Sequence, residues 1–112
     1  KQITAIFQPH MVANVERALH QLPHFPGFTL QRAKGRGRSR AAGLAYRATE
    51  WDLDEHDKVV LLVLCSDQIA PEIVETIRRS PHTGLPGDGL IALSDVAQVL
   101  RIGTSEHGEE AV

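Results

Sequence analysis

The sequence predicts a single α+β domain in which one antiparallel sheet carries two helices on one face. Two changes of hydrophobic period predict this fold. Alternation near the N-terminus gives way to helical spacing, and helical spacing returns after an uninterrupted apolar run from Val59 to Cys65. The 112 residues are 42% hydrophobic and 23% charged, which is ordinary globular usage. A chain of this length is expected to form one domain, residues 1–112.

The first half is expected to run strand, helix, strand. Apolar and polar residues alternate from Gln2 to Gln8, as in a half-buried strand. Apolar residues then recur at helical spacing from Met11 to Leu22, and Pro23 ends this helix. In a second strand, Phe28 and Leu30 share one face.

The second half is expected to repeat this order. The β-branched run from Val59 to Cys65 predicts a central strand that is buried on both faces. Ser66 and Asp67 are expected to cap a second amphipathic helix. Two short strands, Leu90 to Leu93 and Gln98 to Ile102, should precede a polar tail.

The resulting order, strand, helix, strand, strand, helix, strand, predicts the ferredoxin-like split β-α-β (βαββαβ) sandwich. Both helices would cover one face of the sheet and leave the other face open. In so small a domain, a second copy of the chain is the simplest cover for the open face.

Composition narrows the classes of function. The net charge of −2 argues against a nucleic-acid partner, which normally requires a basic surface. No apolar stretch approaches the ~20 residues of a membrane span and no signal peptide is recognisable, so the cytoplasm is the expected location. Cys65 is the only cysteine, which excludes an internal disulfide. No local pattern of nucleophile and base is visible, so we expect a protein that is not an enzyme.

A basic ladder follows the second strand. Its five cations alternate with small residues: Arg32, Lys34, Arg36, Arg38 and Arg40. In an extended segment they would share one face, and guanidinium groups suit phosphate or carboxylate oxygens. A hairpin arm that is ion-paired with the acidic stretch from Glu50 to Asp57 explains the ladder equally well.

Two connections have the composition of binding segments. The one from Arg36 to His56 is far longer than an ordinary hairpin loop of about 2–5 residues. It contains Tyr46, Arg47 and Trp51, which are typical of a protein-binding anchor, although a loop packed back on its own domain remains an alternative. The other, Thr83 to Gly89, could form an anion-binding nest or only a turn before a strand.

Over essentially its whole length, the chain resembles the PII signal-transduction family. The matching blocks keep the family's spacing: Lys34-Gly35, Gly37-Arg38, Tyr46-Arg47, Lys58, Thr83-Gly84, Gly87-Asp88-Gly89 and Arg101-Ile102, with Thr104, Glu106 and Gly108 in the tail. Members are trimeric ferredoxin-like regulators that sense nucleotides and nitrogen status. The loop around Tyr46 is similar to their effector-contacting T-loop.

The resemblance implies a homotrimer with an adenine-nucleotide cleft between neighbouring subunits, in which ATP, ADP or AMP is the effector. The implied cleft residues are Thr29, Gly37, Arg38, Ser39, Leu64, Gly87, Asp88, Gly89 and Arg101. Residues 36–56 would contact a regulated enzyme or membrane transporter through Arg40, Tyr46, Arg47 and Trp51. Lys58 matches the residue that meets a carboxylate of 2-oxoglutarate.

The chain also departs from the family pattern. Leu90 and Gly103 stand where members usually carry cations, and two lost charge-assisted contacts of about 1.5–3 kcal/mol each would weaken triphosphate binding. Ser39 replaces the Gln that helps to hold magnesium and 2-oxoglutarate. Trp51 stands at the place of a modifiable Tyr, and its indole has no hydroxyl to modify.

Three other hypotheses remain. A PII-like sensor of a metal or another small ligand would use some of the histidines: His10, His20, His24, His56, His82 and His107. A small enzyme for phosphorylated substrates would use the basic ladder as a clamp. An RNA-binding module has the least support, because the aromatic pair expected on neighbouring strands is missing.

Overall fold

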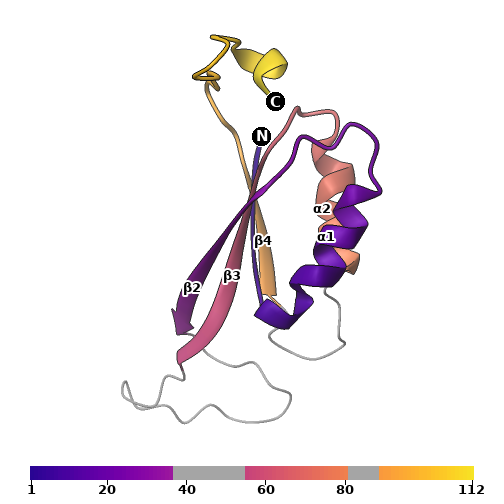
Figure 1. The fold of residues 1–112 in the computed structure, drawn as a ribbon, viewed down its shortest axis with the longest axis vertical. Coiled ribbons are helices and arrows are strands. Elements are labelled where there is room, and N and C mark those ends of the chain that lie inside the picture. Colours follow the sequence, from indigo (N-terminus) through magenta and orange to yellow (C-terminus); the bar gives the residue numbers. More distant parts are fainter. Residues whose placement is uncertain (37–54, 81–88) are drawn as a thin grey trace.

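A computed structural model describes residues 1–36, 55–80 and 89–112. The strands are β1 (Gln2–Phe7), β2 (Thr29–Arg36), β3 (Glu55–Leu64) and β4 (Gly89–Ser94). The helices are α1 (Val12–His20) and α2 (Ala70–Arg79), with short 3-10 turns η1 (Pro9–Met11) and η2 (Gly108–Ala111). Both helices lie on the same side of the sheet, which confirms the α+β ferredoxin-like fold (Figure 1).

The sheet has the strand order β2-β3-β1-β4, and all three pairings are antiparallel. The prediction of a central strand at Val59 to Cys65 is confirmed, since β3 lies between β2 and β1. Its two faces differ, however. Val59, Leu61 and Val63 are buried under the helices, whereas the alternate residues are only half-buried. The strand was expected to be buried on both faces, but in the single chain only the face under the helices is buried.

The core lies between the sheet and the two helices. β1 contributes alternate residues, and Ile3 and Ala5 are fully buried. Val15 from α1 and Ile73 from α2 are fully buried as well, as the helical spacing predicts. Phe28, just before β2, packs against this core. The hydrophobic period of the sequence predicts which of these residues are buried, and therefore also the packing of the helices on the sheet.

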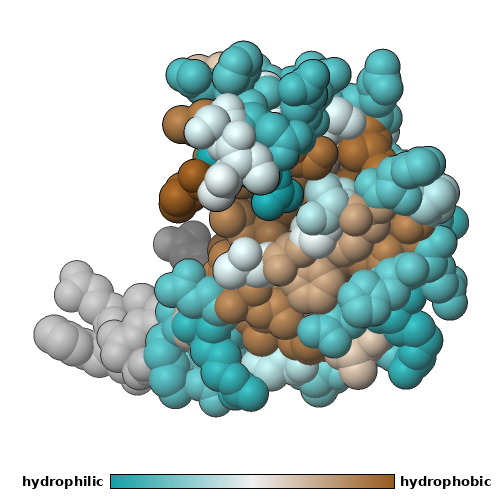
Figure 2. Space-filling model, turned by 45° about the horizontal axis from the view of Figure 1, so that its top comes forward, coloured by the Kyte–Doolittle hydropathy of each residue, from teal (hydrophilic) through white to brown (hydrophobic). Residues whose placement is uncertain are grey.

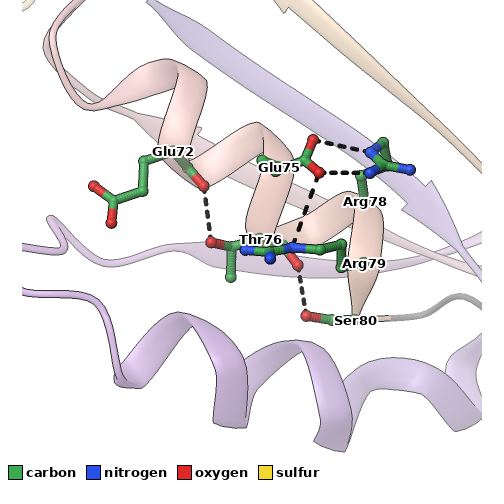
Figure 3. A network of polar contacts seen from close by, with 6 residues as sticks. All are labelled: Glu72, Glu75, Thr76, Arg78, Arg79 and Ser80. Carbon is green, nitrogen blue, oxygen red and sulfur yellow. Dashed lines mark hydrogen bonds and ion pairs between the residues drawn. The ribbon is translucent and has the colours of Figure 1, made fainter.

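The last turns of α2 are fixed by hydrogen bonds within the helix (Figure 3). Thr76 is buried, and its hydroxyl donates to the carbonyl oxygen of Glu72 over 2.8 Å. The Ser80 hydroxyl donates in the same way to the carbonyl oxygen of Thr76, over 2.6 Å. On the exposed side, Arg78 binds Glu75 through two nitrogens, with Nε 2.9 Å from Oε2. The buried hydroxyl therefore has a partner, as burial of a polar group requires.

Two expected local features are wrong. No side-chain hydrogen bond caps α2, because the helix begins only after Ile69 and a backbone turn joins it to the preceding residues. In that turn the Ala70 N–H donates to the carbonyl oxygen of Ser66 over 3.2 Å, so the expected cap at Ser66 and Asp67 lies a turn too early.

The expected strand from Gln98 to Ile102 is absent from the described tail. Only Leu100 pairs, in an isolated bridge with His107. The chain reverses directly after it, and the Ser105 N–H donates to the carbonyl oxygen of Arg101 over 3.0 Å. The turn-forming residues from Gly103 to Ser105 thus override the strand propensity of the apolar residues before them.

The sheet face that carries no helix is largely apolar. Strand register assigns to it alternate residues of the three strands β1, β3 and β4: Gln2, Thr4, Ile6, Val60, Leu62, Leu64, Leu90, Ala92 and Ser94. We call these residues the open face. Leu90 on this face is 58% exposed. Figure 2 shows apolar and hydrophilic areas side by side on the side of the molecule that it presents. The folded chain thus leaves apolar surface uncovered.

None of the helices in the described parts of the chain is long and apolar enough to cross a membrane.

Candidate functional site

Strand register places the described members of the expected nucleotide cleft at opposite ends of the sheet. At one end of β1, Gln2 stands opposite Leu64, and at the other end Phe7 stands opposite Gly89. Five residue steps along a strand separate these ends by about 17 Å. Leu64 and Gly89 of one chain therefore lie at opposite ends of the sheet.

Thr29 lies at the same end as Leu64. It opens β2 opposite Leu62, so it shares a face with Leu64 on the neighbouring strand. Thr29 is exposed and Leu64 is half-buried. The residue before it, Phe28, is held by ring contacts, with its centroid 5.8 Å from that of Phe25 and 6.0 Å from that of His20. This aromatic cluster anchors the start of β2.

Arg101 belongs to the tail, which lies beyond the end of the sheet where β1 begins (Figure 1). Its N–H donates to the carbonyl oxygen of Glu106 over 2.8 Å, so its backbone is fixed in a turn. The Thr104 hydroxyl donates to the Glu106 carboxylate over 2.7 Å and closes the same turn. Arg101 itself is exposed. Arg101, Thr29 and Leu64, all expected cleft residues, thus lie at one end of the sheet.

Gly89 belongs to the opposite end and has a structural role of its own. Its φ is +133°, and a Cβ built on it would lie 2.1 Å from the carbonyl oxygen of Ile6. No side chain fits there, so the close approach of β4 to β1 explains this glycine without a ligand. Leu90 follows it and stands opposite Ile6 on the open face.

The basic ladder begins as expected, because β2 is extended through Arg36. Arg32 and Lys34 stand opposite Val59 and Asp57, on the face that carries the helices. Lys34 Nζ lies 2.6 Å from Asp57 Oδ1, and both side chains are 65% exposed. The hydrogen bond from Lys34 and its charge hold the pKa of Asp57 below its usual range, with a smaller contribution from the charge of Arg32.

The ion-paired hairpin is therefore correct for Lys34. Arg36 stands opposite Glu55 in the register, which continues the alignment of cations with acids. Arg38 and Arg40 of the ladder lie outside the described residues.

Lys58 lies on the other face of this hairpin. It stands opposite Ala33, and its side chain crosses toward the next residue of that face, Gly35. A Cβ on Gly35 would lie 2.9 Å from Lys58 Cγ. Val59, the residue after Lys58, pairs with Phe7, and Gly89 pairs with Phe7 on its other side. Lys58, which is expected to meet 2-oxoglutarate, therefore lies at the same end of the sheet as Gly89 of the expected nucleotide cleft.

Most of the other expected site residues lie outside the described parts of the chain: Gly37, Arg38, Ser39, Gly87 and Asp88 for the nucleotide, and Arg40, Tyr46, Arg47 and Trp51 for the target. Of the expected histidines, His82 lies outside as well. Among the residues that the structure does describe, no group of three or more His, Cys, Asp or Glu side chains could hold a metal ion.

Sequence reasoning missed three local relationships: the contact of Lys58 with Gly35, the approach of Gly89 to Ile6, and the aromatic cluster before β2. The first two depend on strand register, and the hydrophobic period of the sequence does not determine which residues of two strands pair. The signal for the third was available, because Phe25 and Phe28 are three residues apart after a helix that ends nearby.

Comparison with known proteins gives a uniform result. The family model described as "Nitrogen regulatory protein P-II" matches residues 1–106. A curated nitrogen regulatory protein P-II of Azospirillum brasilense is 37% identical over 112 residues, which are 100% of this chain and 99% of that protein. The protein of that name from Rhizobium meliloti (strain 1021) is 38% identical with the same coverage. Nitrogen regulatory protein P-II 1 of Escherichia coli (strain K12) is 37% identical, again with 100% and 99% of the two chains covered.

Proposed function

Because the chain belongs to the nitrogen regulatory protein P-II family, we propose that it is a signal-transduction regulator that binds an adenine nucleotide between its subunits. Residues 36–56 would then contact a target enzyme or transporter in nitrogen-linked regulation, and the protein would act by binding rather than by turnover. The observation that carries the proposal is the division of the expected cleft between the two ends of one sheet.

A divided cleft is completed when one end of a subunit meets the other end of its neighbour. Such a head-to-tail contact is heterologous, and it closes into a ring when the rotation between subunits is suitable. For this chain we propose a homotrimeric ring. Thr29, Leu64 and Arg101 of one subunit would then face the residues around Gly89 and Lys58 of the next.

The open face supports the same assembly. Its apolar residues, among them Ile6, Leu62 and Leu90, are only half-buried or exposed in the single chain. Each gains free energy when it is removed from water, at about 25 cal/mol per Å² of apolar surface. A second and third copy would supply the layer that the helices supply on the other face.

For the ligand, we propose ATP, ADP or AMP with a reduced preference for the triphosphate. Leu90 is an apolar residue directly after Gly87-Asp88-Gly89 in the sequence, and Gly103, two residues after Arg101, has no side chain. Fewer cations are then available for the phosphate charge, so Arg101 carries a larger share of it. Lys58 is the residue that would take a carboxylate of 2-oxoglutarate, and Ser39 is expected to weaken the magnesium-dependent part of that binding.

Assembly is tested by light scattering after size-exclusion chromatography. We expect a trimer for the unmodified chain and a folded monomer for Leu90→Glu, because that side chain is exposed before assembly and charged after substitution. Ala13→Glu, which adds the same charge at an exposed position of α1, should remain trimeric. A monomeric unmodified chain would contradict the proposed assembly.

Ligand binding is tested by isothermal titration with ATP, ADP and AMP, each with and without magnesium and 2-oxoglutarate. We expect about one nucleotide per subunit, with loss of binding in Arg101→Ala because the guanidinium would contact phosphate. Arg17→Ala is the matched control, since Arg17 is an exposed cation on α1. Absence of saturable binding at millimolar nucleotide, or equal effects of both variants, would contradict the proposed ligand.

A further inference from the structure

The hairpin of β2 and β3 continues past the rest of the sheet. The last residues that β1 pairs with β3 are Phe7 and Val59, and β2 pairs Arg32 with the same Val59. Four further pairs follow between β2 and β3 alone: Ala33 with Lys58, Lys34 with Asp57, Gly35 with His56, and Arg36 with Glu55. We call these four pairs the outer ribbon. It is two strands wide and continues beyond the last rung of β1.

Burial stops where the outer ribbon begins. Val59 is 4% exposed and closes the core at this end of β3. Beyond it, none of the residues 33–35 and 56–58 is buried. A two-stranded ribbon without an apolar layer is marginally stable at best in water. Pairing of the two strands in the outer ribbon therefore depends on backbone hydrogen bonds and on side-chain contacts that are exposed to water.

Side-chain contacts lie on both faces of the outer ribbon. On the face that carries the helices, Lys34 Nζ and Asp57 Oδ1 are 2.6 Å apart and stand directly opposite each other. On the other face, the Lys58 side chain lies over Gly35. The Lys34–Asp57 contact is between opposite charges, and both of its side chains are 65% exposed. Salt therefore screens it, since the Debye length falls from about 10 Å at 0.1 M to about 3 Å at 1 M salt.

We propose that the outer ribbon is a salt-sensitive hinge, which opens and closes locally while the four-stranded sheet stays intact. The Lys34–Asp57 pair biases it toward the closed state. Local opening of this kind is expected where few apolar contacts and many exposed backbone hydrogen bonds coincide. Because the outer ribbon joins the sheet to residues 37–54, its opening frees the two strands at their connection with that segment. This inference does not depend on nucleotide binding or on the proposed target.

Hydrogen exchange of the unmodified full chain tests the hinge. On going from about 0.05 M to about 0.5 M salt, amides of residues 33–35 and 56–58 should exchange about two- to fivefold faster, the range expected for an exposed pair. Amides of Ile3 to Phe7 and of Leu61 to Val63 should keep their rates. Equal exchange of the outer ribbon at both salt concentrations overturns the proposal.

Three variants separate the pair from general effects of charge. Asp57→Asn should raise exchange of the outer ribbon at low salt and reduce its salt response, whereas Asp57→Glu should retain the response. Glu75→Gln changes the net charge as Asp57→Asn does and removes a comparable exposed pair on α2, so the outer ribbon should be unaffected. The proposal fails if Asp57→Asn leaves the outer ribbon unchanged, or if exchange in that variant rises equally throughout β1.

Discussion

Gly89 lies so close to Ile6 that a Cβ added to it would be 2.1 Å from the Ile6 carbonyl oxygen. The contact joins the first residue of an edge strand to the backbone of a central strand. It shows that a glycine in a segment expected to bind anions is required by the packing of the sheet. A role of Gly89 in ligand binding therefore has to be tested at a variant that still folds.

Gly89→Ala should lower the free energy of unfolding by at least about 2 kcal/mol, because it combines a left-handed φ with a clash against backbone. Urea unfolding at a fixed protein concentration measures this change. Gly27→Ala should cost about 1 kcal/mol, since Gly27 has φ +101° but nothing within 4 Å of an added Cβ. Gly103→Ala, with open space around it, should stay within about 0.5 kcal/mol. Equal effects at all three positions would refute this ranking.

Gly35→Ala should have a small effect on stability and a clear effect on Lys58. The added Cβ would lie 2.9 Å from Lys58 Cγ, which is part of a flexible side chain and can move away. We expect a loss below about 1 kcal/mol, because repacking of a surface side chain is cheap. The displaced Lys58 should show a changed methylene environment in a carbon-13 NMR spectrum. An unchanged Lys58 signal would contradict the contact.

Cys65 should resist alkylation in the folded protein. Its side chain is 3% exposed, and burial raises the pKa of its thiol above the ordinary value. Iodoacetamide at about pH 8 should label it slowly in buffer and fully in denaturant, because the thiolate is the reactive form. Rapid labelling without denaturant would contradict the burial of Cys65.

The same raised pKa predicts a loss of stability in alkali. In the unfolded chain the thiol ionises at a lower pH than in the folded chain, so stability falls as the pH rises above about 8.5. Cys65→Ala removes this titration, and its stability should fall less steeply between about pH 8 and pH 10. Parallel curves for the two proteins would show that Cys65 does not contribute.

The ion pairs of Glu75 should make the protein less stable as the pH falls into the acid range, whereas Cys65 makes it less stable as the pH rises. Hydrogen bonds from Arg78, with the charges of Arg78 and Arg79, hold the pKa of Glu75 below its ordinary value. The stabilisation is complete above about pH 4.3, the unfolded value, and is lost as the pH falls through the lower folded value. In urea unfolding, Glu75→Gln should therefore show a flatter acid limb than Glu72→Gln, an exposed control on the same helix. If the free energy of unfolding falls equally steeply in acid for both variants, the ion pair of Glu75 with Arg78 does not contribute to stability.

How far the sequence predicts this molecule depends on the range of the interaction concerned. The buried face of β1 and the helix face at Ile73 follow from local period, so strands, helices and layers could be predicted. The strand expected at Gln98 to Ile102 could not, because the turn after Leu100 reverses the chain and its partner is His107 rather than a sheet edge. Local propensity carries no information on which partner a strand will find.

The candidate site shows the same limit. The residue types of the basic ladder indicate anion binding and ion pairing equally, and only the register places Lys34 against Asp57. The separation of Leu64 from Gly89 likewise depends on which strand lies beside β1. These relationships join residues far apart in the sequence, and they are set by topology.

The place of β1 in the sheet has a consequence for biosynthesis. β1 comes early in the chain, yet its two neighbours are β3 and β4, which come from the second half. Such distant contacts make folding slow, because the entropy of the chain between the partners is lost before the pairing stabilises the fold. A nascent chain on the ribosome therefore holds β1 without either neighbour until β3 emerges, and its sheet is completed only when β4 follows.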